Sequence, residues 1–162
     1  TWPYDYNGIY GYRNFILYDE KKEVAAVANS IWVLMDTKLN RPVKITEEDY
    51  QAYQNEPAYK MEYAERKIIV PKELTSLPPF TVMPSYIDVL NHVNNAQYIR
   101  MASDYVDENF QIKQMRADYR KSALLGDIIY PSISKTKDCI TVVLSDKEGH
   151  PYVNVAFHGT IE

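Results

Sequence analysis

The chain has 162 residues, of which 46% are hydrophobic and 25% charged, and its formal net charge is −4 at pH 7. This composition is too apolar for a disordered chain, and the length is sufficient for a buried core. The acidic balance argues against a general nucleic-acid binder, whose binding surface should be basic.

The cysteine and histidine content limits the sites that the chain can build. Cys139 is the only cysteine, which excludes an intrachain disulfide and a cysteine zinc site. No two histidines show metal-ligand spacing, so we expect neither a metal nor a cofactor. No signal peptide and no apolar stretch of about 20 residues is present, so we expect a cytoplasmic protein without a membrane span.

The first half of the chain is predicted to form a β-hairpin followed by a short helix. Residues 10–19 and 24–36 are strand candidates on either side of a charged turn. The second strand is almost continuously apolar, which predicts that both of its faces are covered. Thr46 and the acidic residues after it predict a capped helix through Gln54. Residues 55–77, charged and containing prolines, are predicted to be a linker packed along a surface.

The second half is predicted to form one helix followed by an antiparallel sheet. A strand from Phe80 leads to a polar sequence at residues 91–95, and a helix over 95–108 follows, because apolar residues recur there at helical spacing. Strands are then predicted from Ile112 onward, with turns at Gly126-Asp127 and at 146–149. This order is typical of an α+β fold in which a curved antiparallel sheet wraps a long helix.

Residues 88–98 (DVLNHVNNAQY) resemble the D-x-N-x-H-V-N-N-x-x-Y stretch of the plant and bacterial acyl-acyl carrier protein (acyl-ACP) thioesterases. Further matches occur in the family's order, and they are residues 12–15 (YRNF), 30–36 (SIWVLMD), 41–43 (RPV), Tyr119-Arg120 and Gly126-Asp127. The resemblance implies a hotdog fold with one complete C-terminal unit at 78–162, a linker at 55–77 and part of an N-terminal unit at 1–54. It also implies that the family's N-terminal helix and opening strands are absent from this chain.

The resemblance implies that the chemistry lies at the start of the central helix, with Asp88 and His92 as the catalytic residues. Asn91, Asn94, Asn95 and Ser122 are the implied supporting and substrate-positioning residues. A histidine suits the role of base because its pKa lies near working pH, and amides at a helix start are unsatisfied donors for an oxyanion. We therefore expect the N–H groups of residues 93–95 to be free.

Two questions about these residues stay open at the level of sequence. Either Asp88 or His92 could be the base that activates water. Aspartate or asparagine before a helix is also the ordinary cap, and a histidine near a cap is often structural.

The sequence departs from the family pattern within the same site. Leu90 occupies the position of a family asparagine, and the asparagine stands one residue later. Ser122 stands where many members have a glutamate, with Ala123 where plant enzymes have a cysteine. Loss of groups that hold water and tune a base predicts a rate lower by about 10²–10⁴-fold.

We therefore expect a thioester hydrolase that acts on fatty acyl-ACP and releases free fatty acid in fatty acid biosynthesis. One alternative is a non-catalytic fragment or degenerate paralogue that binds acyl chains or the carrier, and another is an acyl-CoA thioesterase. The chain-length preference stays open. An open sheet edge in the partial unit predicts a homodimer or larger assembly, which a clean monomer in sedimentation would contradict.

Overall fold

The computed structural model describes residues 1–39, 41–51 and 53–161. The chain divides into two compact units, Thr1–Glu65 (unit 1) and Arg66–Glu162 (unit 2). The division falls within residues 55–77, the predicted linker. In the described part of the chain, no helix combines the length and apolar character that crossing a membrane requires.

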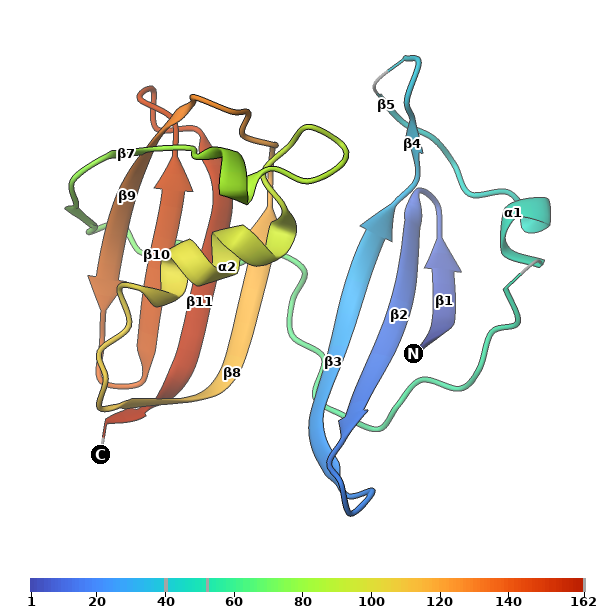
Figure 1. The fold of residues 1–162 in the computed structure, drawn as a ribbon. Coiled ribbons are helices and arrows are strands. Elements are labelled where there is room, and N and C mark those ends of the chain that lie inside the picture. The colour runs from blue at the N-terminus through green and yellow to red at the C-terminus, as the bar shows by residue number, and fades with distance from the viewer. Residues whose placement is uncertain (40, 52, 162) are drawn as a thin grey trace. The chain divides into compact units, whose positions relative to one another are not determined.

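Unit 1 contains a three-stranded antiparallel sheet in the order β1-β2-β3 (Figure 1). Its strands are β1 (Trp2–Asn7), β2 (Tyr10–Tyr18) and β3 (Val24–Val33). The predicted hairpin is formed by β2 and β3, with Tyr10 opposite Val33 and Tyr18 opposite Val24. β1 was not predicted, although Trp2, Tyr4 and Tyr6 alternate along its sequence, because the run is short and a proline such as Pro3 argues against a strand.

Residues 57–63 cover one face of this sheet and are held there by Asn14. The Asn14 side chain is fully buried, and its Oδ1 accepts hydrogen bonds from the Tyr59 backbone N–H (3.0 Å) and the Tyr63 hydroxyl (3.1 Å). The Asn14 amide nitrogen lies 3.8 Å from the Met61 sulfur. A buried amide is stable only when it is hydrogen-bonded, so Asn14 fixes the path of this segment.

The burial of β3 differs from the prediction. Its apolar side chains are largely exposed, with Val24 49%, Trp32 60% and Val33 41% accessible. The prediction that both faces of this strand are covered is therefore wrong for the described residues. β3 pairs only with β2 there, and an edge strand of so small a sheet has few elements to cover it.

The rest of unit 1 is a small ladder and one short helix. β4 (Met35–Asp36) pairs with β5 (Arg41–Pro42), and α1 spans Glu47–Gln51. Thr46 and Asp49 cap α1 reciprocally, since the Thr46 N–H donates to Asp49 Oδ2 (2.8 Å) and the Asp49 N–H to Thr46 Oγ1 (3.3 Å). The capped start is as predicted, although α1 is shorter than expected; Ala52 lies outside the described residues.

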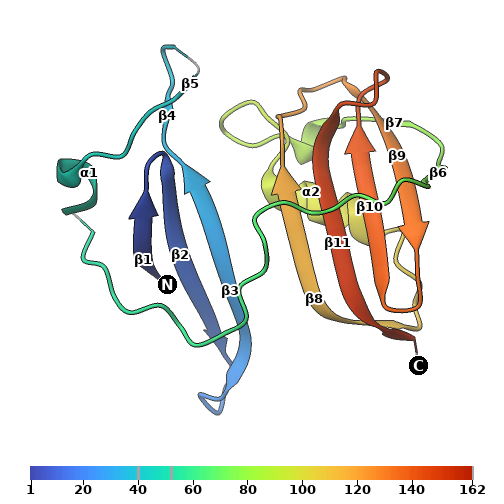
Figure 2. The same ribbon diagram turned by 180° about the vertical axis from the view of Figure 1, so that it is seen from behind.

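Unit 2 is a six-stranded sheet with one α-helix, α2 (Asn95–Ser103), on a single face (Figures 1 and 2). The strand order is β6-β9-β10-β11-β8, and β7 pairs with β9. The strands are β6 (Thr75–Ser76), β7 (Phe80–Thr81), β8 (Phe110–Tyr119), β9 (Ile128–Lys135), β10 (Cys139–Ser145) and β11 (Pro151–Ile161). The sheet is antiparallel, as predicted. β9, β10 and β11 follow one another as a meander, whereas β8 pairs with β11 and not with β9, the next strand in the chain.

The core of unit 2 lies between α2 and the sheet. Tyr98, Met101 and Ala102 are the buried residues of the helix, and they belong to one apolar cluster with alternate residues of β10 and β11. α2 ends at Ser103, earlier than the predicted Glu108. After Ser103 the backbone turns, with the Val106 N–H donating to the Ser103 carbonyl (3.0 Å). Val106 still packs on the core from this turn, which explains why side-chain periodicity alone extended the helix.

Candidate active site

The polar motif forms a tight loop that leads into α2. The Asp88 N–H donates to the His92 carbonyl (2.9 Å), and Ile87 pairs with Val93 just outside this contact. Asn91 has a φ of 60°, in the left-handed region that asparagine tolerates better than most residues. Residues 88–92 are therefore a closed loop, in which main-chain contacts bring Asp88 and His92 together.

The Asp88 carboxylate is used within this loop. Its Oδ1 accepts a hydrogen bond from the Leu90 N–H (2.9 Å), and its Oδ2 lies 3.5 Å from the Asn94 amide nitrogen. The first contact is an aspartate turn, which stabilises the loop whatever the chemistry of the site. The second leaves Oδ2 only weakly engaged, directed toward the helix start.

Asn94 is the N-cap of α2. It has extended backbone angles, and its side-chain oxygen accepts from the Ala96 N–H (2.9 Å). The structural role considered for Asn94 is therefore present. The nitrogen of the same amide group faces Asp88, so the Asn94 side chain can cap the helix and contact Asp88 at the same time.

The backbone amides at the helix start are less available than the sequence suggested. The Val93 N–H donates to the Ala123 carbonyl (3.0 Å) and the Asn94 N–H to the Tyr86 carbonyl (2.9 Å). The expectation that residues 93–95 all present free donors is therefore wrong for Val93 and Asn94, because long-range contacts use them. Among the described residues, the Asn95 N–H has no such partner.

His92 and Leu90 are both exposed at the edge of this site. The His92 imidazole forms no hydrogen bond with the described residues, so it is accessible to a ligand. Leu90 is 70% exposed and its neighbour Val89 97% exposed. Leu90 thus contributes its N–H to the loop, while its side chain supplies no polar group.

Ser122 lies in the segment that follows β8, and its neighbour Ala123 connects this segment to the motif. Ala123 is fully buried and accepts from the Val93 N–H, as described above. The Ser122 side chain is exposed and forms no hydrogen bond within the described residues. The fold therefore brings the segments carrying His92 and Ser122 side by side.

Sequence reasoning missed a polar cluster beneath this segment. Asp127 Oδ2 accepts from the Leu124 N–H (2.9 Å) and lies 3.3 Å from the Tyr152 hydroxyl. Burial, and then the nearby Asp127 carboxylate, raise the pKa of Tyr152 to about 12. The only sequence signal was Gly126-Asp127, which indicated a turn.

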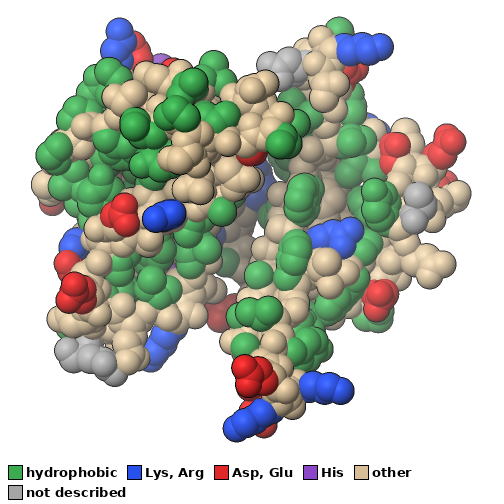
Figure 3. Space-filling view, in the orientation of Figure 1, with side chains coloured by type: hydrophobic (Ala, Val, Ile, Leu, Met, Phe, Trp, Pro, Cys, Tyr) green, Lys and Arg blue, Asp and Glu red, His purple; other side chains and the backbone are tan. Residues whose placement is uncertain are grey.

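Apolar side chains surround the same end of unit 2. Figure 3 shows many hydrophobic side chains on the α2 side of this unit. The exposed ones around the site are Met83, Val89, Leu90, Leu124 and Leu125 in loops and Ile128 at the start of β9. In the part of the chain that the structure describes, no cluster of three or more His, Cys, Asp or Glu side chains has the arrangement of a metal site.

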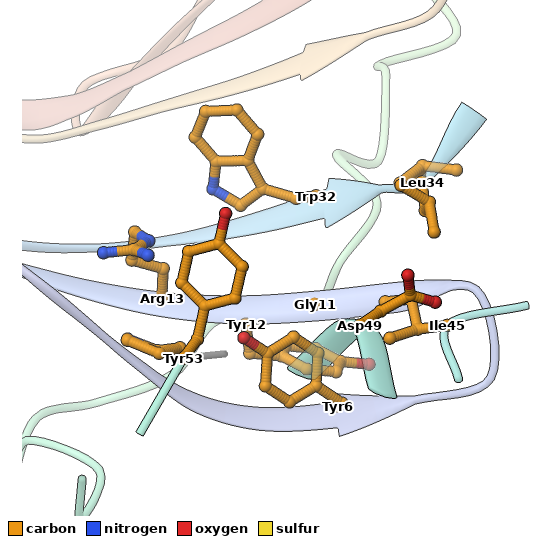
Figure 4. A pocket seen from close by; sticks show the side chains of 11 residues that line it. Tyr6, Gly11, Tyr12, Arg13, Trp32, Leu34, Ile45, Asp49 and Tyr53 are labelled. Atoms are coloured by element: carbon orange, nitrogen blue, oxygen red, sulfur yellow. The ribbon is translucent and has the colours of Figure 1, made fainter. Parts of the chain in front are cut away.

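Unit 1 contains a separate pocket of about 360 Å³ between its sheet and the α1 region (Figure 4). Tyr6, Tyr12, Trp32 and Tyr53 supply aromatic walls, and the other lining residues are Pro3, Gly11, Arg13, Val33, Leu34, Ile45 and Asp49. Gly11 lies opposite Trp32 on paired strands, and a Cβ atom at Gly11 would meet the Tyr6 ring at 3.2 Å. The sequence did not predict this pocket.

Models of one protein family match both units of the chain. A family model described as the acyl-ACP thioesterase N-terminal domain matches residues 1–53, and one described as the acyl-ACP thioesterase C-terminal domain matches residues 71–156. A comparison with curated protein sequences finds no match.

Two similar solved structures show that the fold is an α+β hotdog fold. An acyl-ACP thioesterase from Bacteroides thetaiotaomicron has a TM-score of 0.84 at 16% identity, over 98% of this chain and 66% of that one. A 12:0-ACP thioesterase from Umbellularia californica has a TM-score of 0.81 at 17% identity, over 99% of this chain and 66% of that one. The chain thus spans about two thirds of the length of these proteins.

Proposed function

Because this chain belongs to the acyl-ACP thioesterase family, we propose that it hydrolyses fatty acyl-ACP thioesters and releases free fatty acid in fatty acid biosynthesis. The observation that carries the proposal is the contact between Val93 and Ala123 (3.0 Å), which joins the segment of His92 to that of Ser122 at the start of α2. The exposed imidazole of His92, the carboxylate of Asp88 and the free N–H of Asn95 all lie within residues 88–95, beside this contact.

In the proposed reaction, His92 is the base that takes a proton from water. The water oxygen attacks the thioester carbonyl carbon, and the carbonyl oxygen becomes an oxyanion. The Asn95 N–H is the available donor for this oxyanion. The intermediate then collapses, the carbon–sulfur bond breaks, and the thiolate of the carrier leaves and takes up a proton.

The remaining residues of the motif have supporting roles in this proposal. Asp88 acts beside His92 through Oδ2, the oxygen that the Leu90 N–H does not occupy. Asn94 holds the helix start and faces Asp88, while Asn91 permits the left-handed turn that closes the loop. Ser122 contributes a hydroxyl at the position of the family's glutamate, where it can hydrogen-bond water but cannot act as a base.

We further propose that residues 78–162 are a complete hotdog unit and that residues 1–54 are the closing part of another. Residues 55–77 are the proposed linker, whose end forms β6 and pairs with β9 of unit 2. The N-terminal family model, which matches residues 1–53, supports this division. The aromatic pocket of unit 1 is of a size and character suited to an apolar chain, so it is a candidate acyl site.

One alternative has a specific observation in its favour. Leu90 presents an exposed apolar side chain where the family has an amide, and Ser122 replaces a carboxylate. Both changes remove polar groups that would hold the attacking water. A chain that binds acyl groups or the carrier without turnover would tolerate both.

Thiol release from acyl-ACP and from acyl-CoA tests the proposal, with wild-type protein beside His92→Ala and a matched control, His150→Ala. His150 is also an exposed histidine of unit 2, but it lies in the turn between β10 and β11. We expect wild-type turnover on acyl-ACP, a loss of about 10²–10⁴-fold in His92→Ala, and no change in His150→Ala.

Other results would redirect the assignment. Folded wild-type protein that turns over no faster than His92→Ala, yet binds acyl-ACP, would establish the non-catalytic alternative. Faster turnover of acyl-CoA than of acyl-ACP would instead favour the acyl-CoA thioesterase.

A further inference from the structure

We propose that Tyr98 and Tyr119 form a positioning pair that fixes the segment of Ser122 against the start of α2; this inference rests on the proposed function. Tyr98 lies in α2 and Tyr119 at the end of β8. Their ring centroids are 6.2 Å apart, with 55° between the ring planes. Each hydroxyl contacts the backbone of a different part of the candidate site.

The Tyr98 hydroxyl determines the orientation of the Ser122–Ala123 peptide. It accepts a hydrogen bond from the Ala123 N–H at 2.7 Å, and both residues are buried, at 2% and 0% exposure. In a trans peptide the N–H and C=O point in opposite directions, so the Ser122 carbonyl must point away from Tyr98. Through this one contact, the helix fixes the backbone that carries Ser122.

The carbonyl of Ala123 completes the connection to the motif. It accepts from the Val93 N–H, next to His92 in sequence (3.0 Å). Ala123 therefore contacts Val93, two residues before α2, through its carbonyl, and Tyr98 of α2 through its N–H. A shift of this segment would move His92 and Ser122 relative to each other, since no other described contact links these two stretches so directly.

The Tyr119 hydroxyl acts on the other side of the helix start. It donates to the Asn95 carbonyl at 3.2 Å. Asn95 is the residue whose N–H remains available for the proposed oxyanion. The Asn95 carbonyl lies in the peptide group that follows this N–H, so the contact restrains the first turn of α2 next to the donor.

A purely packing role does not account for the Tyr98 hydroxyl. A phenylalanine ring would fill the same apolar space, whereas a buried hydroxyl is costly unless it is hydrogen-bonded. Here its partner is a backbone N–H of the site segment. The Tyr98 hydroxyl therefore holds residues 122–124 in place, in addition to the packing of its ring in the core.

The test measures kcat and KM on acyl-ACP for the full chain with Tyr98→Phe, Tyr119→Phe or the control Tyr105→Phe, per mole of folded protein. Tyr105 is a half-buried tyrosine that packs on the same core, outside the site segments. We expect kcat to fall by about 10²-fold in Tyr98→Phe with KM little changed, because small misplacements of reacting groups affect the chemical step. The control should retain wild-type values.

Wild-type kcat in Tyr98→Phe would overturn the proposal, as would an equal loss in Tyr105→Phe. If Tyr98→Phe does not fold, Tyr119→Phe tests the proposal instead. Tyr119 is 42% exposed, so loss of its hydroxyl should not prevent folding. A fall in its kcat at constant KM supports the pair, and an unchanged kcat overturns it.

An NMR measurement separates this inference from the proposed function. If the wild-type chain shows no turnover, the proposed function fails, but the positioning geometry is still tested. Tyr98→Phe should then accelerate amide exchange at Ala123 and shift the signals of His92 and Asn95, with the Gly149 turn unchanged. Unaltered exchange and signals at these residues would overturn the positioning role.

Discussion

The backbone N–H of Val93 donates to the carbonyl of Ala123 at 3.0 Å, and this contact joins two stretches of chain that carry the candidate chemistry. Val93 is itself buried, at 3% exposure, so the contact is shielded from water. A shielded hydrogen bond is costly to break without a replacement. The relative placement of the motif loop and the Ser122 segment is therefore a property of the folded core of unit 2.

Substitution of Asn94 separates its cap from any role in chemistry. Asn94→Ala removes the acceptor for the Ala96 N–H, so unit 2 should lose about 0.5–2 kcal/mol of unfolding free energy in urea. Asn94→Ser keeps a capping oxygen but lacks the nitrogen that faces Asp88, so its stability should be close to wild type. If Asn94 also positions Asp88, Asn94→Ser should hydrolyse thioesters more slowly than wild type despite its near wild-type stability. Full activity in that variant would assign Asn94 to capping alone.

Asn14 should control whether residues 57–63 stay on the sheet of unit 1. Asn14→Ala removes the acceptor for the Tyr59 N–H and the Tyr63 hydroxyl. A buried donor left without a partner costs about 1–3 kcal/mol, so this segment should detach. Limited proteolysis should then cut within 57–63 faster than in wild type. Tyr63→Phe removes only one of the two contacts and should show a smaller increase, and equal cleavage of all three proteins would contradict the anchoring role.

Asp146 should make the stability of unit 2 depend on pH in the acid range. The hydrogen bond from Lys121, together with the His150 N–H (2.8 Å), lowers the pKa of Asp146 from 3.8 to about 2. A carboxyl group with a lowered folded-state pKa stabilises the protein above its unfolded pKa, and this contribution is lost as the pH falls through the folded value. Asp146→Asn should therefore be less stable than wild type at pH 5, and the difference should shrink between about pH 4 and 2.

Urea unfolding of wild type and Asp146→Asn at a series of pH values measures this effect. Lys121→Met should show the same convergence with wild type at low pH, since it removes the main cause of the lowered pKa. A stability difference that stays constant from pH 5 to 2 would show that Asp146 has no such linkage.

Local signals in the sequence were sufficient to predict much of the fold. The β2–β3 hairpin follows from two apolar runs around a charged turn, and the start of α2 follows from Asn94 before a helical repeat. These features depend on neighbours in sequence, which a pattern records directly. The predicted end of α2 is an exception. Val106 packs on the core from a turn, so its spacing in sequence resembles that of a helical residue.

Long-range contacts account for what the sequence could not reveal. The amides of Val93 and Asn94 are occupied by Ala123 and Tyr86, partners that no local pattern identifies. The pocket of unit 1 likewise brings together Tyr6 of β1, Tyr12 of β2 and Trp32 of β3, which belong to three different strands. The motif located the candidate site, whereas the available donors within it depend on tertiary structure.

The exposure of the Leu90 side chain determines which substitutions position 90 can accept. Its backbone N–H alone supports the loop, through Asp88, and its side chain points away from the packed core. Almost any residue that accepts the same backbone angles can therefore occupy position 90 without loss of folding. A directed-evolution library could sample this position freely, and Leu90→Asn would restore the family's amide in a single step.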